Sequence, residues 1–211
     1  GSEMCIRDSL MGERTTESAA RAARQALATL QAADRPVLSI NGNVAALACD
    51  EMLQLADHLS CPVEVNIFYR TPERMEAILN HMNERKLALG LEVPVLGHAP
   101  DAQIPGLKGP RAACHREGIL ESDVILVPLE DGDRCNALVA MGKTVIVIDL
   151  NPLSRSAQQG SITIVDELSR ALNTMLGIAA EEGHLAIDAS YDHQAVLNEG
   201  LAAVLSGLKK P

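Results

Sequence analysis

The stretch DVILVPLEDGDRCNALVAMGKTVIVIDLNPLSR, residues 123–155, contains the pattern that decides the fold. Two short runs rich in β-branched residues, 124–127 and 145–148, predict two strands, and residues 134–141 between them have the apolar spacing of a short helix that ends at Gly142. Continuous rather than alternating apolar runs are typical of strands covered by helices on both faces. We therefore expect an α/β fold of the doubly wound type, with a mostly parallel sheet and helices on both faces.

The rest of the chain continues this alternation. Further strands are predicted at residues 36–40, 62–68, 92–96 and 161–165, and further helices at residues 16–33, 45–59, 72–89, 111–117, 166–180 and 191–208. The Gly- and Pro-rich residues 97–110 form the longest irregular stretch. A loop of this length in a compact domain more often has a function than serves only as a connection. Since no strand follows the last helix, we expect it to pack on the edge of the sheet or on a second subunit.

Composition restricts the class of protein. The chain has 211 residues, 47% of them hydrophobic, and a formal net charge of -10, which suits one domain whose field repels phosphate backbones and anionic lipid. We therefore expect neither nucleic acid nor a membrane as a partner. No apolar run approaches the roughly 20 residues of a membrane span, and the N-terminus lacks a signal pattern, so a cytoplasmic location is expected. The five cysteines contain no C-x-x-C pair and predict neither a disulfide framework nor a zinc site.

Polar side chains gather in the loops that leave the predicted strands, at residues 41–43, 66–71, 97–109, 130–134 and 149–155. Ligands of such sheets bind outside the carboxyl ends of the strands, so these loops predict one anion-binding crevice that is suited to a nucleotide. Residues 41–43 place backbone N–H groups at a helix start, although an ordinary tight turn explains them equally well. Glu130, Asp131 and Asp133 suit Mg²⁺, or else Asp133 caps the following helix. Asp149 suits ribose hydroxyls, or else bonds to its own loop.

Arginines and one histidine complete the candidate site. A guanidinium binds phosphate or carboxylate through two hydrogen bonds, and for each candidate the alternative is a solvated surface charge. These arginines are Arg70, Arg111, Arg134 and Arg155. His98 is a candidate acid, base or phosphate partner, or else a histidine with no special role. The absence of a G-x-x-x-x-G-K-[ST] loop and of a G-x-G-x-x-G fingerprint argues against a standard P-loop NTPase and a standard NAD enzyme.

Five blocks in one register resemble the archaeal phosphopantothenate synthetase family, also called 4-phosphopantoate--beta-alanine ligases. The blocks are SINGNVAAL (39–47), VNIFYRT (65–71), PDAQIPGL (100–107), VPLEDGDR (127–134) and IDLNPLSR (148–155). The resemblance implies a single Rossmann-like ligase domain over residues 12–211. We expect residues 1–11, which lie outside the resemblance, to be a remnant, and we assign no function to them. Family members have a longer N-terminal segment in this place, with basic residues that reach the nucleotide.

The resemblance also implies an activity and a set of site residues. It implies a homodimer in coenzyme A biosynthesis that joins 4-phosphopantoate to β-alanine with ATP and Mg²⁺, releasing AMP and diphosphate through an acyl-adenylate. ATP is expected at Asp131, Gly132, Asp133, Arg134, Asp149, Leu150 and Asn151, with Mg²⁺ near Asp131 or Asp133. Substrate is expected at Asn43, Arg70, His98, Asp101, Arg111 and Arg155. No catalytic residue is assigned. The alternatives are a nucleotide- or phosphometabolite-binding module that N-terminal shortening leaves inactive, and a dehydrogenase with an unusual fingerprint.

Overall fold

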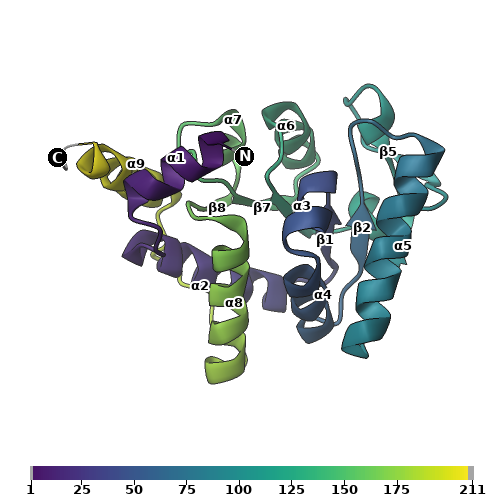
Figure 1. Ribbon diagram of the computed structural model, residues 1–211, viewed down its shortest axis with the longest axis horizontal. Coiled ribbons are helices and arrows are strands. Elements are labelled where there is room, and N and C mark those ends of the chain that lie inside the picture. The colour runs from purple at the N-terminus through teal and green to yellow at the C-terminus, as the bar shows by residue number, and fades with distance from the viewer. Residues whose placement is uncertain (1, 209–211) are drawn as a thin grey trace.

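The computed structural model describes residues 2–208 and contains a six-stranded sheet in the order β3-β2-β1-β6-β7-β8 (Figure 1). The strands are β1 (Pro36–Ile40), β2 (Val63–Val65), β3 (Val95–Leu96), β6 (Val124–Pro128), β7 (Thr144–Ile148) and β8 (Ile162–Ile164). Every pairing within this sheet is parallel. The chain runs outward from β1 to β3 and then returns to β6 on the other side of β1. This reversal creates the switch point at which doubly wound sheets bind their ligands.

Helices cover both faces of the sheet, as predicted. One face packs against α2 (Glu17–Ala32), α3 (Gly42–Leu47), α4 (Cys49–His58), α5 (Pro72–Leu89) and α8 (Leu168–Glu182). The other face packs against α6 (Gly132–Ala140), which contacts α7 (Arg155–Gln159). Leu38 points toward the first layer and its neighbour Val37 toward the second, so both sides of β1 are buried. This double cover explains why the strands read as continuous apolar runs.

The two ends of the described chain pack together beside β8. Helix α9 (His193–Gly207) contacts the edge strand β8 and α2, which corresponds to the first of the two alternatives, packing on the edge of the sheet. Helix α1 (Ser2–Met11) packs on α9, and Met11 is buried against Leu150 and Leu197. The segment to which the sequence assigns no role is therefore helical, and it joins a small apolar cluster next to the loop after β7.

Two predicted elements differ in the structure. The helix predicted at residues 111–117 is wrong, because this segment forms the turn η1 (Pro110–Ala112) and the strand β5 (Ala113–Cys114), which pairs with β4 (Ala102–Gln103). The Asn66 side-chain amide binds two carbonyls of the segment, so tertiary contacts outweigh its helical spacing. The helix predicted at residues 45–59 is interrupted at Ala48, where α3 ends and α4 begins.

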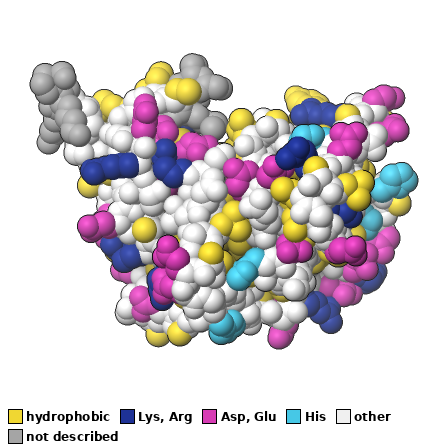
Figure 2. All heavy atoms as spheres, turned by 60° about the horizontal axis from the view of Figure 1, so that its bottom comes forward, with side chains coloured by type: hydrophobic (Ala, Val, Ile, Leu, Met, Phe, Trp, Pro, Cys, Tyr) yellow, Lys and Arg dark blue, Asp and Glu magenta, His cyan; other side chains and the backbone are white. Residues whose placement is uncertain are grey.

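Three features of the described residues correspond to the composition: the surface charges, the helix hydropathy and the cysteines. On the face that Figure 2 shows, acidic and basic side chains are interspersed, without a large area of one sign. Within residues 2–208, none of the helices has both the length and the apolar character that crossing a membrane requires. Four cysteines are buried free thiols, and burial raises the pKa of Cys61, for example, to about 12. These four thiols are packing groups.

Candidate functional site

Polar loops from neighbouring strands meet at the carboxyl edge of the sheet. Asn43 follows β1, Asp133 follows β6, and Asn151 and Arg155 follow β7. Because β1, β6 and β7 are adjacent and parallel, these side chains lie along one edge, where α3, α6 and α7 begin (Figure 1). The structure therefore brings together loops that are separate in the sequence, and it does so at the switch point.

A cavity of about 290 Å³ lies at this switch point, and we call it the switch-point cavity. Its lining includes the predicted residues Asn43, Arg111 and Asp131, together with three further polar residues, Asn66, Arg74 and Glu130. Asn66 and Arg74 were not among the predicted site residues. Asn66 is nevertheless the first residue of the polar loop 66–71 that the sequence assigns to the crevice, and this position is the signal that could have singled it out. The sequence carries no comparable signal for Arg74, which lies on the surface of a predicted helix.

A buried network of charges stands behind the cavity. Arg111 pairs with both Glu130 and Asp131, and the guanidinium of Arg134 lies 2.6 Å from Glu130 Oε2 and 3.1 Å from Ser39 Oγ. The Arg134 side chain is 0% exposed and that of Glu130 is 5% exposed. Arg134 is therefore in position to hold Glu130 in place from behind, rather than to reach a ligand at the surface.

Asp131 and Asp133 have different partners although they flank the same glycine. Asp131 caps α6, since its Oδ1 accepts a hydrogen bond of 2.9 Å from the backbone N–H of Arg134. Asp133 does not cap; it pairs at 2.8 Å with Arg155, and the two side chains are 73% and 68% exposed. At Gly132 a Cβ would overlap that of Arg155, so only glycine allows the loops after β6 and β7 to approach this closely.

The loop after β1 is held by its own asparagine. Asn41 Oδ1 accepts from the N–H groups of Asn43 and Val44 at 3.0 Å each, and Asn41 Nδ2 donates to the carbonyls of Pro128 and Leu129. For residues 41–43 the sequence allowed either an anion-binding helix start or an ordinary tight turn. The tight turn describes the structure better, because two of the N–H groups expected to bind an anion already have an acceptor. Leu129 has a φ of 51°, an uncommon backbone conformation for leucine that this bridge stabilises.

The polar side chains of the loop after β7 also form most of their hydrogen bonds within the loop itself. Asp149 accepts hydrogen bonds from the backbone N–H of Asn151 at 2.8 Å and from Ser154 Oγ at 2.5 Å, so the alternative of bonding to its own loop describes the structure. Leu150 is buried at 3% exposure. Asn151 Oδ1 accepts from the N–H of Leu153. The exposed polar groups next to this loop are those of Asp133 and Arg155.

A second and larger cavity, of about 650 Å³, lies between α5 and the loop after β3, and its lining includes Arg70 and His98. We call it the α5 cavity. The Arg70 guanidinium donates to the carbonyl of Gly97, and burial lowers the pKa of Arg70. Asp101 lines neither cavity; the N–H of Arg116 donates to it at 2.8 Å and lowers its pKa. The residues expected beside phosphopantoate are thus divided, with Arg111 in one cavity and Arg70 and His98 in the other.

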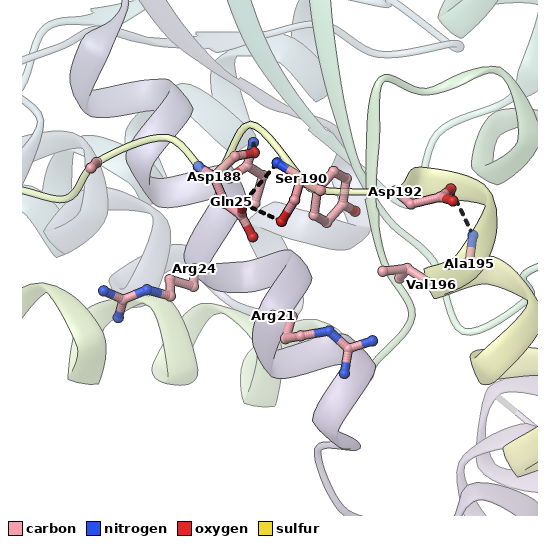
Figure 3. Close-up of a pocket in the computed structure, with 10 residues that line it drawn as sticks. Arg21, Arg24, Gln25, Asp188, Ser190, Asp192, Ala195 and Val196 are labelled. Atoms are coloured by element: carbon pink, nitrogen blue, oxygen red, sulfur yellow. Dashed lines mark hydrogen bonds between the residues drawn. The ribbon is translucent and has the colours of Figure 1, made fainter.

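A third cavity contains none of the predicted site residues. It has a volume of about 300 Å³ and lies between α2 and residues 186–196. Figure 3 shows the side chains of Arg21 and Arg24 extending away from Asp188 and Ser190. Arg21 pairs with Glu199, and Arg24 pairs with Glu182. Since both cations already have partners, this cavity is a weaker candidate than the two at the carboxyl edge.

The predicted magnesium ligands fit the ion unequally. In the part of the chain that the structure describes, no group of three or more His, Cys, Asp or Glu side chains could hold a metal ion. Both oxygens of Asp131 are engaged, by Arg111 and by the N–H of Arg134. Asp133 uses one oxygen for Arg155 and is largely exposed. Asp133 is therefore the better ligand, and phosphate oxygens would have to supply most of the coordination.

Comparison with known proteins gives consistent matches along the chain. The sequence profile of the phosphopantothenate/pantothenate synthetase family matches residues 18–206. A 4-phosphopantoate--beta-alanine ligase from Methanosarcina mazei is 46% identical over 208 residues, which cover 96% of this chain and 80% of the relative. Relatives with the same name from Thermococcus onnurineus and Thermococcus kodakarensis are 46% and 44% identical over 209 residues, which cover 96% of this chain and 78% of each relative.

Proposed function

Because this chain belongs to the phosphopantothenate/pantothenate synthetase family, we propose that it is a 4-phosphopantoate--beta-alanine ligase of coenzyme A biosynthesis. The observation that carries the proposal is the extent of the match, which reaches 46% identity over 96% of the chain. The gathering of Asn43, Asp133, Asn151 and Arg155 along one edge of the sheet supports it, since the reaction needs ATP and an acid side by side.

The chemistry has two steps. The carboxylate of 4-phosphopantoate attacks the α-phosphorus of ATP, so that diphosphate leaves and an acyl-adenylate forms. The amine of β-alanine then attacks the acyl carbon, the carbon–oxygen bond to AMP breaks, and the amine loses its proton. A carboxylate is a poor electrophile, and the first step provides it with a good leaving group. The contribution of the protein is therefore positioning and charge neutralisation.

The exposed edge next to β7 is the part of the site that we assign to ATP. Arg155 and Asp133 lie at the surface there, beside the loop of Asp149 and Asn151, and the Arg155 guanidinium can bind phosphate oxygens. Arg134 acts as a positioning residue, since its side chain is buried behind Glu130. When Mg²⁺ is bound, Asp133 would hold it, and the ion would neutralise phosphate charge.

The α5 cavity is the part of the site that we assign to the phosphorylated acid. Arg70 and His98 both line it, and they offer a guanidinium and an imidazole to a phosphate or carboxylate. The homodimer is a further part of the proposal, and sedimentation velocity on the purified chain would measure it.

A product assay tests the function. ATP is incubated with 4-phosphopantoate and β-alanine, separately and together, and the nucleotide products are separated by chromatography. AMP that forms only when both acids are present is the expected result. Formation of ADP, or an equal rate of AMP formation without β-alanine, would reject the proposal that the protein is a ligase. ATP binding in a calorimeter with no product after long incubation would instead favour a binding module without turnover.

A further inference from the structure

We propose that the switch-point cavity is the β-alanine subsite, with Arg74 as the residue that binds the carboxylate of this substrate. The inference rests on the proposed function and deepens it. Three observations on the described residues carry it: a cationic side chain without a partner there, a buried acceptor without a donor there, and a lining in which Arg74 is the charge left unpaired.

The cationic side chain is that of Arg74 on α5. Among the described residues, no hydrogen bond or ion pair involves its guanidinium, although the protein is acidic overall. Arg74 lines the cavity next to Gly42, where an added Cβ would lie only 2.8 Å from Arg74 Nη2. Glycine at position 42 therefore gives the guanidinium room over the first turn of α3. An arginine in this position can bind a carboxylate through two hydrogen bonds.

The buried acceptor is Asn66 Oδ1. Asn66 Nδ2 donates to the carbonyls of Arg111 and Ala113 at 3.2 and 3.0 Å, and two carbonyl partners determine which end of the amide is the nitrogen. Asn66 is 1% exposed, and its Oδ1 has no hydrogen-bond partner within the part of the chain that the structure describes. Burying an acceptor without a donor is unfavourable, because the oxygen loses its hydrogen bonds to water. Asn66 is among the residues that line the cavity, and a substrate ammonium or amine that reached Oδ1 would supply the missing N–H.

The charges of the lining decide between the substrates. Arg74 and Arg111 contribute two positive charges, and Glu130 and Asp131 contribute two negative charges, so the lining is neutral in total. β-Alanine is a zwitterion with no net charge and a separated ammonium and carboxylate. Glu130 and Asp131 are already paired with Arg111, and Glu130 also with Arg134, so among the described residues Arg74 is the unpaired charge of the lining. One guanidinium matches the single carboxylate of β-alanine, whereas ATP and 4-phosphopantoate each carry several negative charges. The lining therefore matches β-alanine best.

Steady-state kinetics of Arg74→Gln test the subsite, with AMP release measured while each substrate is varied in turn. Loss of a charge-assisted hydrogen bond is worth about 1.5–3 kcal/mol, which is about a tenfold or larger rise in KM for β-alanine. The values of KM for ATP and 4-phosphopantoate should change by less than about twofold. Arg85→Gln is the matched control, because Arg85 lies on the same helix and pairs with Asp50 outside the cavity. A rise in KM for ATP or 4-phosphopantoate instead would overturn the assignment.

Gly42→Ala provides an independent test. The added methyl would displace the flexible end of Arg74, so KM for β-alanine should rise while the fold is retained. If both changes act through the same guanidinium, Gly42→Ala should have no further effect in the Arg74→Gln background. Effects that multiply would show that Gly42 acts separately, which would contradict this role of Arg74.

Calorimetry separates failure of the subsite from failure of the proposed function. If the wild-type chain releases no AMP, the ligase proposal fails, and β-alanine is then titrated directly into the wild type and into Arg74→Gln. Binding to the wild type that is lost in the variant would still support the subsite. Equal binding to both, or no binding to the wild type, would overturn it.

Discussion

Asp133 and Arg134 are neighbours in the sequence and both form ion pairs, yet they belong to two regions that differ in exposure to solvent. Asp133 is 73% exposed and faces Arg155 across the gap between the loops after β6 and β7. Arg134 is 0% exposed and pairs with Glu130 behind the switch-point cavity. We call the first region the exposed pair and the second, with Arg111 and Glu130, the buried network. The comparison shows that charged residues in one loop can serve the ligand or the fold, and burial distinguishes the two roles.

The physical basis of this difference is solvation. Exposed ion pairs contribute about 0–1 kcal/mol, because water competes for both partners. Removing one partner of a buried pair costs about 3–5 kcal/mol, because the other charge remains desolvated. Substitutions in the buried network should therefore reduce stability, whereas substitutions in the exposed pair should change ligand affinity.

The largest effect is expected for Arg134→Met. This change retains the apolar part of the side chain but leaves Glu130 with Arg111 as its remaining cation, so unfolding should become easier by about 3 kcal/mol. Urea titration of the variant and the wild type measures the difference. If the free energies of unfolding agreed within about 1 kcal/mol, the network would not have the structural role assigned to it.

A smaller loss is expected for Arg111→Met. Its guanidinium is 12% exposed, pairs with Glu130 and Asp131, and lies 5.5 Å from the centroid of the Phe68 ring. We expect a loss of about 2 kcal/mol, below that for Arg134, because Arg134 continues to neutralise Glu130. The same urea titration measures this loss. A loss greater than that of Arg134→Met would reverse the order of the two arginines.

A smaller change in the free energy of unfolding is expected with pH, and its source is Glu64 on β2. Burial raises the pKa of Glu64 above its ordinary 4.5, although the N–H groups of Ile119 and His115 oppose the change. The folded state therefore binds more protons than the unfolded state, and this carboxyl reduces stability as the pH rises above about 4.5. Glu64→Gln cannot titrate, so the stability of the wild type minus that of the variant should fall from pH 4 to 8. A difference that grows with pH would show that the native state favours the carboxylate.

The smallest effect on stability is expected for Arg155→Gln. Because both members of the exposed pair are more than half exposed, the free energy of unfolding should change by less than about 0.5 kcal/mol. The KM for ATP should nevertheless rise about tenfold, which corresponds to one charge-assisted hydrogen bond to phosphate. An unchanged KM for ATP would remove Arg155 from the nucleotide site.

The sequence predicts the framework of the fold well, because the strands are continuous apolar runs and the helices have clear caps. Thr16 and Thr71, for example, each accept the backbone hydrogen bond expected of a helix cap. It also predicts the edge where the polar loops meet, since that edge follows from parallel strands. The β5 segment was not predictable from local spacing, because its conformation depends on the pairing with β4 and on hydrogen bonds from Asn66, which is distant in the chain. Nor does the sequence distinguish the role of Arg134 from that of Arg155. Which of the two side chains is buried depends on tertiary packing, which local sequence does not show.

Thermal unfolding of Arg155→Gln and Arg134→Met, each with and without ATP and Mg²⁺, tests this contrast most directly. A ligand that binds the folded state stabilises it by RT ln(1 + [L]/Kd), so the midpoint of unfolding rises with the logarithm of affinity. At an ATP concentration about ten times the wild-type Kd, a roughly tenfold loss of affinity removes most of this stabilisation. We predict that Arg155→Gln unfolds at the wild-type temperature without ligand and loses most of the shift caused by ATP, whereas Arg134→Met unfolds at a clearly lower temperature without ligand. A full ATP shift in Arg155→Gln, or equal midpoints for Arg134→Met and the wild type, would contradict the division between the exposed pair and the buried network.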